Sequence, residues 1–194
     1  MNQTKLTKFF KIKSPRINDM NNFIQKTDQK NNQKNNQKTG SKINKNNSII
    51  DKKDDNSQKR YVMRFDGASK GNPGEAGAGA VIYENDTEIW TTSRYLGKQT
   101  NNYAECFAMV LGIEEAYNRG IRNLLVEGDS MLIINQLKGK WQIKNKDLKM
   151  LHLSIALILK SFNSIIYNHI YRNFNSRADE LANLSLQKEN RFLL

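Results

Sequence analysis

Hydrophobic positions follow regular periods from residue 61 onward, and they predict a folded region that begins with strands. Residues 61–65, 78–83 and 88–96 are three β-prone runs at hairpin spacing. We therefore predict an antiparallel meander. From residue 104 to residue 117 the hydrophobic positions recur every three to four residues, which predicts a helix that ends near Gly120.

The rest of the folded region alternates between strands and helices. Residues 124–126 form the short apolar run of a strand buried on both faces. Residues 130–137 and 148–161 predict two helices, residues 164–171 a last strand, and Ser176 the cap of a final helix. Parallel neighbours need a crossover, whereas antiparallel neighbours need only a turn. The fold class is therefore α/β, with a mixed five-stranded sheet of an antiparallel meander plus two parallel strands, flanked by helices.

The first sixty residues have a different texture and carry most of the net charge. They hold 15 Lys and Arg against 5 Asp, whereas residues 61–194 hold 16 against 14 acids. A segment so poor in aliphatic residues cannot offset its ordering entropy, so we predict a disordered tail over residues 1–60 and a folded domain over 61–190. Its charge is either that of a solvated linker or a source of phosphate affinity.

Cysteine usage and hydropathy bear on location. Cys106 is the single cysteine, which excludes an internal disulfide and favours a reducing, intracellular compartment. No run approaches the length of a membrane span, and no secretory signal is evident, so we expect no membrane association.

Four carboxylates lie at the ends of predicted strands or the starts of predicted helices, where functional groups can converge. Asp66 and Asp129 follow predicted strands, and Glu105 and Asp179 fall in what the periodicity predicts as first helical turns. Dipole compensation explains either helical acid taken singly. If all four converge, their repulsion needs a bound cation, and oxygen ligands suit Mg²⁺ or Mn²⁺. Two ions about 3.5–4 Å apart are a recurring device for phosphodiester cleavage.

Four segments carry a resemblance to a known family. Residues 66–74 (DGASKGNPG), 100–105 (TNNYAE), 127–130 (EGDS) and 175–183 (NSRADELAN) are similar, in order, to the signature segments of type 1 ribonuclease H. The resemblance implies the ribonuclease H-like fold and two-metal hydrolysis of the RNA strand of RNA–DNA hybrids, leaving 5′-phosphate and 3′-hydroxyl ends. It also implies that Asp66, Glu105, Asp129 and Asp179 bind the metal ions.

The same resemblance implies substrate contacts. Backbone near Gly67, Ser69 and Asn72 would meet the 2′-hydroxyls that distinguish RNA from DNA. The further contacts that it implies, with a phosphate and the sugars of the DNA strand, are Lys98, Thr100, Asn101 and Trp141. A helix-capping loop over residues 100–102 and a core position for Trp141 are the alternative interpretations.

The chain also departs from many family members. Only residues 138–146 separate the second and third helices, too few for a basic handle, so the chain resembles the handle-less plant and archaeal type. The loop before the last helix lacks the mobile His of many members. Arg172 is the predicted stand-in, in contact with the scissile phosphate, while His152 and His169 are interpreted as packing residues.

The N-terminal stretch has a binding pattern of its own. Gln3, Leu6, Phe9 and Phe10 fit the spacing Gln-x-x-aliphatic-x-x-aromatic-aromatic, which resembles the peptide that docks on replication sliding clamps. The alternative is a transient amphipathic turn without a partner.

These patterns lead to one expectation and its rivals. We expect a monomeric, Mg²⁺-dependent ribonuclease H that removes RNA primers or hybrids during DNA replication, in the nucleus or at a viral or cytoplasmic replication site. The rivals are another nuclease of the same fold and a hybrid-binding protein without catalysis.

Overall fold

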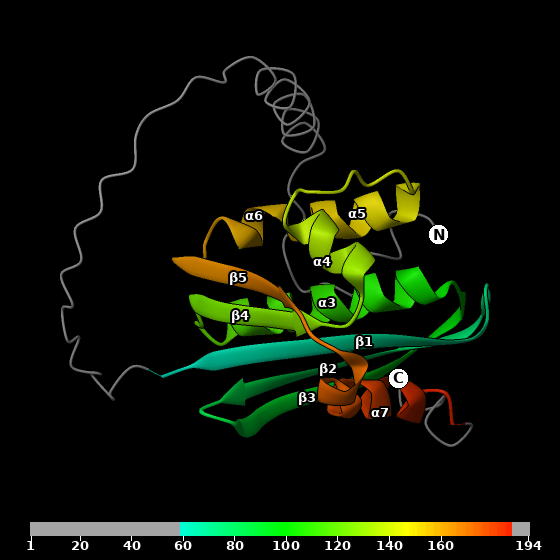
Figure 1. The fold of residues 1–194 in the computed structure, drawn as a ribbon, viewed down its shortest axis with the longest axis horizontal. Helices are drawn as coiled ribbons and strands as arrows, with labels where there is room; N and C mark the ends of the chain where they lie inside the picture. Colours follow the sequence, from blue (N-terminus) through cyan, green and yellow to red (C-terminus); the bar gives the residue numbers. More distant parts are fainter. Residues whose placement is uncertain (1–58, 188–194) are drawn as a thin grey trace, which may run out of the picture. The chain divides into compact units, whose positions relative to one another are not determined.

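The computed structural model describes residues 59–187, which form one mixed sheet with helices (Figure 1). Most of the predicted tail, with the stretch predicted to bind a clamp, lies outside the described residues. The elements are β1 (Tyr61–Gly71), β2 (Gly74–Glu84), β3 (Thr87–Gln99), α3 (Asn101–Asn118), β4 (Asn123–Gly128), α4 (Met131–Leu137), α5 (Lys146–Ser154), α6 (Ala156–Leu159), β5 (Ser164–His169), the 3₁₀ helix η1 (Arg172–Phe174) and α7 (Ser176–Leu184).

The sheet has five strands in the order β3-β2-β1-β4-β5. β1, β2 and β3 pair antiparallel, and the turn between β2 and β3 is made by Asn85 and Asp86 in the left-handed region that such tight hairpins need. β1 pairs parallel with β4, and β4 pairs parallel with β5. The predicted fold class is confirmed.

The two faces of the central strands meet different helices. A Cβ added to Gly67 would lie 2.2 Å from the backbone nitrogen of Glu105 in α3, so β1 and α3 approach closely there. A Cβ on Gly79 would lie 2.3 Å from the nitrogen of Ala182 in α7. Gly79 is the cross-strand partner of Asp66, and paired residues point to the same face. Asp66 therefore lies on the face that α7 covers.

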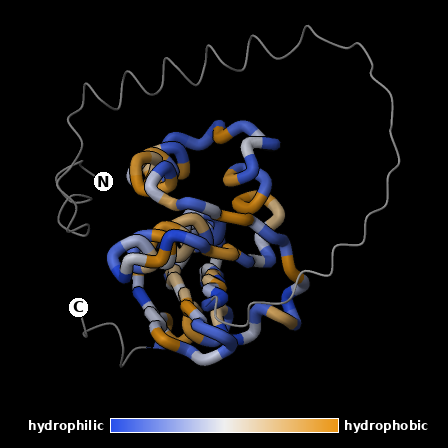
Figure 2. Tube along the Cα trace, turned by 90° about the vertical axis from the view of Figure 1, so that its left-hand side faces the viewer, coloured by the Kyte–Doolittle hydropathy of each residue, from blue (hydrophilic) through white to orange (hydrophobic). Residues whose placement is uncertain are grey.

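The core lies between α3 and the sheet. Met63 and Phe65 on β1, and Met109 and Ile113 on α3, are among the largest fully buried side chains. Figure 2 shows short hydrophobic and hydrophilic runs alternating along the described chain, as expected for strands and helices with one buried side. None of the described helices combines the length and apolar character that a membrane span requires.

Three local predictions differ from the structure. The first strand does not end before Asp66 but continues to Gly71, because β2 pairs with it along its whole length. The helix predicted over residues 148–161 is two helices that meet at Ile155. There the Ser154 hydroxyl donates to the carbonyl of Leu151, a local bond that bends helices. The last helix is preceded by Asn175, not capped by Ser176.

Candidate active site

Four elements bring four acids into electrostatic range of one another. Asp66 lies within β1, Glu105 in α3, Asp129 after the end of β4, and Asp179 in the first turn of α7. Asp66 is almost fully buried, and burial raises its pKa to about 8, with further increases from the charges on Asp129, Asp179 and Glu105. The Gly67 N–H, which donates to Asp66 Oδ1 at 2.7 Å, opposes that rise.

Glu105 is placed by tertiary packing and not by helix capping. Because α3 already begins at Asn101, Glu105 lies beyond the first turn, and the dipole explanation of its position does not apply. Gly67 leaves the space that lets this part of α3 reach β1 beside Asp66. A substrate contact of the Gly67 backbone stays a prediction.

The carboxylate of Glu105 is held by two donors. Asn101 Nδ2 donates to Oε1 at 2.9 Å, and Ser130 Oγ donates to Oε2 at 2.6 Å. Burial raises the pKa of Glu105, and the charge on Asp129 adds to this, while the two hydrogen bonds lower it. Asn101, predicted as a substrate contact, is thus also a partner of a predicted metal ligand.

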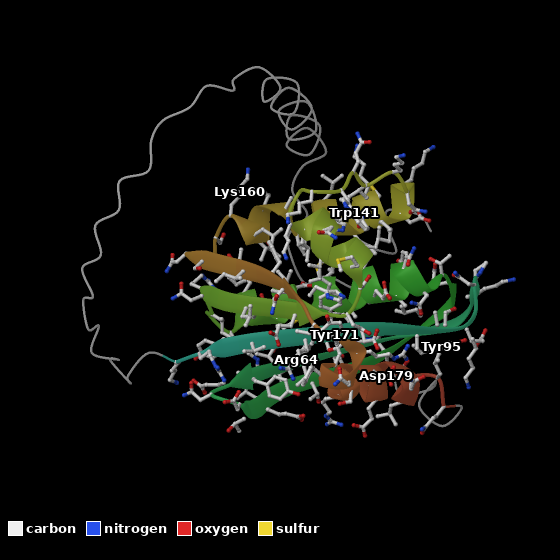
Figure 3. All side chains as sticks on the ribbon, in the orientation of Figure 1. Arg64, Tyr95, Trp141, Lys160, Tyr171 and Asp179 are labelled. Atoms are coloured by element: carbon white, nitrogen blue, oxygen red, sulfur yellow. The ribbon has the colours of Figure 1, made fainter. Side chains whose placement is uncertain are left out.

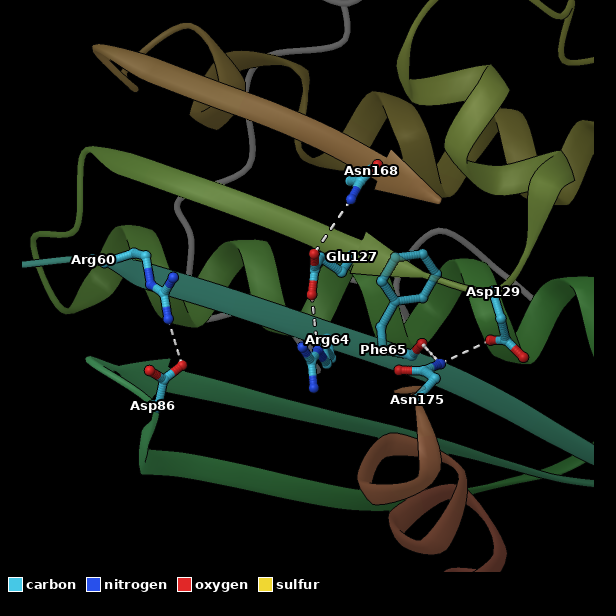
Figure 4. A network of polar contacts seen from close by, with 8 residues as sticks. All are labelled: Arg60, Arg64, Phe65, Asp86, Glu127, Asp129, Asn168 and Asn175. Atoms are coloured by element: carbon cyan, nitrogen blue, oxygen red, sulfur yellow. Dashed lines mark hydrogen bonds and ion pairs between the residues drawn. The ribbon is translucent and has the colours of Figure 1, made fainter. Parts of the chain in front are cut away.

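Asn175 joins three parts of the site, and its position in the sequence pointed to no such role. Its side chain is fully buried, and Nδ2 donates to the Phe65 carbonyl at 2.9 Å and to Asp129 Oδ1 at 2.8 Å (Figure 4). Both partners are acceptors, so the orientation of the amide is determined. Asn175 therefore orients Asp129 and ties β1 to the start of α7. The available signal is its place in the 175–183 motif, where an Asn before a helix suggests only a cap.

Arg172 and His169 border the acids from the segment between β5 and α7. Arg172 donates to Asp179 Oδ1 at 2.7 Å, and this carboxylate raises the pKa of the guanidinium. His169 Nε2 lies 3.2 Å from the Asp129 carbonyl oxygen. The structure thus places Arg172 beside the acids, and it gives His169 a polar contact at the site that its interpretation as a packing residue missed.

The oxygen atoms of the four acids are suitable ligands for a hard divalent cation, but the acids do not form a ready-made metal site. Among residues 59–187, no three His, Cys, Asp or Glu side chains are positioned to hold a metal ion. Arg172, Asn175, Asn101 and Ser130 donate to oxygens of three of the four acids. The donors are nevertheless all oxygen, and the acids repel one another. Asn175 Oδ1 is also buried without a hydrogen-bond partner among the described residues. This unpaired oxygen could accept a hydrogen bond from a water molecule or coordinate a cation.

The other predicted substrate contacts lie in two separate regions of the structure, the first of which is near the start of α3. Asn72 Oδ1 accepts from the N–H of Asn101 at 3.2 Å, which ties the turn after β1 to the start of α3. Ser69 Oγ, within β1, donates to the carbonyl of Gln99 at the end of β3 at 2.9 Å. Thr100 caps α3 by accepting from the Tyr103 N–H. Lys98 lies nearby, exposed on β3.

Trp141 lies elsewhere. It is 48% exposed on the connection between α4 and α5, apart from Tyr171 and Asp179 (Figure 3). The alternative of a core tryptophan is therefore wrong.

Comparison with known proteins places this architecture in a family. The family model described as reverse transcriptase-like matches residues 64–185. Ribonuclease HI of Halobacterium salinarum is 37% identical over 128 residues, which are 66% of this chain and 64% of the relative. A bifunctional protein of Mycobacterium tuberculosis is 36% identical over 126 residues, and the match covers 64% of this chain but only 35% of that relative.

Solved structures agree. RNase H1 of Halobacterium salinarum has a TM-score of 0.62 at 36% identity, covering 66% of this chain and 97% of that chain. LC11-RNase H1 in complex with RNA/DNA hybrid has a TM-score of 0.63 at 34% identity, covering 67% and 99%. The fold and the site thus define a ribonuclease H-like domain. This chain belongs to the ribonuclease H-like family.

Proposed function

We propose that this protein is a ribonuclease H that hydrolyses the RNA strand of RNA–DNA hybrids with Mg²⁺ or Mn²⁺. Asp66, Glu105, Asp129 and Asp179 would hold two ions. The single observation that carries the proposal is that four elements bring these acids together around buried Asp66, whose pKa burial and the other three acids raise to about 8. Such a cluster is tolerable when cations neutralise it. Two family neighbours also support it, since one is named ribonuclease HI and another was solved with an RNA/DNA hybrid.

The protein's own groups would prepare the site for in-line attack on a phosphodiester. Bound divalent ions would supply Lewis acidity toward the phosphate and lower the pKa of water. Asn175 would keep Asp129 in one orientation, and Asn101 with Ser130 would do the same for Glu105. Arg172, exposed and bound to Asp179, is placed to exchange this partner for a substrate phosphate.

Cleavage of a labelled RNA–DNA hybrid tests the proposal. The intact protein should cleave the RNA strand in Mg²⁺ or Mn²⁺, leaving 5′-phosphate and 3′-hydroxyl ends, and Asp129→Asn should not. Asp86→Asn is the matched control, because Asp86 is exposed and pairs with Arg60 away from the site. No cleavage by the intact protein in either metal would overturn the proposal.

The same assay separates the rivals. Hybrid binding without cleavage would favour a non-catalytic hybrid-binding protein, and equal cleavage of double-stranded DNA would favour another nuclease of this fold. The connection between α4 and α5 spans residues 138–145, which supports assignment to the handle-less subgroup.

We further propose that the enzyme acts as a monomer in a reducing compartment where DNA is replicated, recruited by a sliding clamp. Gln3, Leu6, Phe9 and Phe10, which lie outside the described residues, carry this proposal by their spacing. A peptide of residues 1–16 should bind a sliding clamp, and replacing both Phe9 and Phe10 with Ala should abolish binding. Equal binding by both peptides would refute the recruitment while leaving the nuclease proposal intact.

A further inference from the structure

Two exposed aromatic rings lie on the short segment between β5 and α7. Tyr171 is 75% exposed and Phe174 is 60% exposed, which makes them the most exposed large hydrophobic side chains in the part of the chain that the structure describes. Tyr171 directly precedes the 3₁₀ helix η1 and Phe174 is its last residue, and the Phe174 N–H donates to the Tyr171 carbonyl at 2.8 Å. Exposed apolar groups gathered in this way mark binding surfaces.

Contacts with the acidic site hold this segment at both ends. On one side the Ile170 N–H donates to the Gly128 carbonyl at 3.1 Å, directly before Asp129. On the other side Asn175 bonds to Asp129. Between the rings, Arg172 reaches Asp179. Tyr171 and Phe174 therefore flank a cation that touches the site, on backbone anchored beside two of the four acids.

We propose that Tyr171 and Phe174 bind the RNA strand of the hybrid, packing against ribose sugars beside the phosphate that Arg172 contacts. This inference rests on the proposed function and names a subsite within it. Bases inside a duplex are stacked and cannot offer their faces, whereas the shallow minor groove of an A-like helix exposes sugars. The flanking Arg172 supplies the charge complementarity that such a strand requires.

Binding without turnover tests the subsite. Fluorescence anisotropy of a labelled blunt RNA–DNA hybrid in EDTA should show Tyr171→Ala and Phe174→Ala binding each about 5- to 30-fold more weakly, within the range of aromatic contacts to nucleotides. Tyr171→Phe should bind like the wild type. Leu157→Ala and Ile166→Ala are matched controls, because these side chains are 50% and 59% exposed on α6 and β5, and they should not change affinity.

The salt dependence of hybrid binding distinguishes a contribution of the aromatic rings from a contribution of charge. Loss of a ring should weaken binding by the same factor at every salt concentration. Arg172→Ala should instead reduce the slope of log affinity against log salt by about 1. In turnover, the ring variants should raise KM and leave kcat unchanged.

Three results would decide against the subsite. Wild-type affinity in both ring variants would overturn it while hybrid cleavage by the wild type left the proposed function standing. A loss seen only with hybrids that carry single-stranded RNA extensions would overturn contact with the duplex sugars. A change in salt slope equal to that of Arg172→Ala would also overturn it, since it would mean that the rings act through charge. Absence of cleavage by the wild type, in contrast, would refute the proposed function itself.

Discussion

Acids at two neighbouring places along β1 and β4 are treated in opposite ways, since one is paired with a cation and two are not. Glu127 on β4 is buried and has its own cation: Arg64 on β1 donates to it at 2.9 Å (Figure 4). Asn168 on β5 donates to the same carboxylate, and Arg64 also lies over the Tyr83 ring. Asp66, two residues beyond Arg64 on β1, and Asp129, two residues beyond Glu127 and just past the end of β4, lie within electrostatic range of each other without such a cation.

The difference separates an acid that is neutralised within the fold from the acids that we propose to hold metal ions. A buried acid with a permanent cation and a second donor is neutralised within the fold. Asp66 has a single backbone donor and three acidic neighbours, and its pKa rises to about 8. The fold therefore retains an unfavourable charge cluster at one place while it neutralises an acid nearby. Three substitutions and a change of pH test this comparison.

Removal of Asp66 should have the largest effect. Asp66→Asn should lower hybrid cleavage by about a thousandfold or more, the scale expected when a group that stabilises the transition state is lost. The protein should unfold at the same or a higher temperature, because the substitution removes repulsion. Cleavage rates and thermal unfolding measure the two effects. Cleavage close to the wild-type rate would refute the role of Asp66.

Loss of Asn175 should act on catalysis through Asp129. Asn175→Ala should reduce kcat or the apparent metal affinity by about 10- to 100-fold, as for other groups that orient metal ligands. It also removes the hydrogen bond to the Phe65 carbonyl, which should cost about 1 kcal/mol of stability. Asn168→Ala is the matched control, since Asn168 donates to Glu127 and not to Asp129. Equal kinetic losses in both variants would contradict the assignment.

Breaking the neutralised pair should affect stability and spare the chemistry. Arg64→Met leaves Glu127 buried without its cation and should lower the free energy of unfolding by about 1–3 kcal/mol. This is less than for a fully buried pair, because the Arg64 side chain is 32% exposed. Urea unfolding measures it, and kcat of the folded enzyme should stay within about twofold of the wild type, as Arg64 touches none of the four acids. Adding Glu127→Gln to Arg64→Met should recover part of the loss.

The smallest effect is a pH dependence of the metal-free protein. The pKa of Asp66 is about 8 in the folded state against an ordinary value of 3.8, so the folded state keeps a proton that the unfolded chain releases. The contribution of Asp66 to stability is thus fully present below about pH 4 and is lost as the pH rises through 8. Glu114, whose pKa burial raises to about 7, titrates in the same window.

Urea unfolding in EDTA across this range isolates the share of Asp66. Stability of the wild type should fall more steeply with pH than that of Asp66→Asn, in which the contributions of Glu105 and Glu114 remain. Identical slopes would show that Asp66 titrates at its ordinary value.

Local pattern predicted the architecture and the identity of the four acids. Strand and helix periods depend on neighbours a few residues apart, so the amino-acid sequence alone predicts the meander, α3 and the two parallel strands. The break at Ile155 accompanies a local bond between Ser154 and Leu151, whereas the other errors lie where distant groups act. β1 continues past Phe65 because β2 pairs with it. Ser176, predicted as the cap of the last helix, is instead its first residue, after Asn175, whose amide donates to Phe65 and Asp129.

The sequence by itself determined which residues are available for chemistry, since four acids in the 66–74, 100–105, 127–130 and 175–183 segments are a property of the chain. Tertiary structure alone decided which acids are neutralised. Arg64 meets Glu127 across 63 positions of sequence, and Asn175 meets Asp129 across 46. Such partners are chosen by strand register and helix packing, and the raised pKa of Asp66 follows from burial that only the assembled sheet and helices provide.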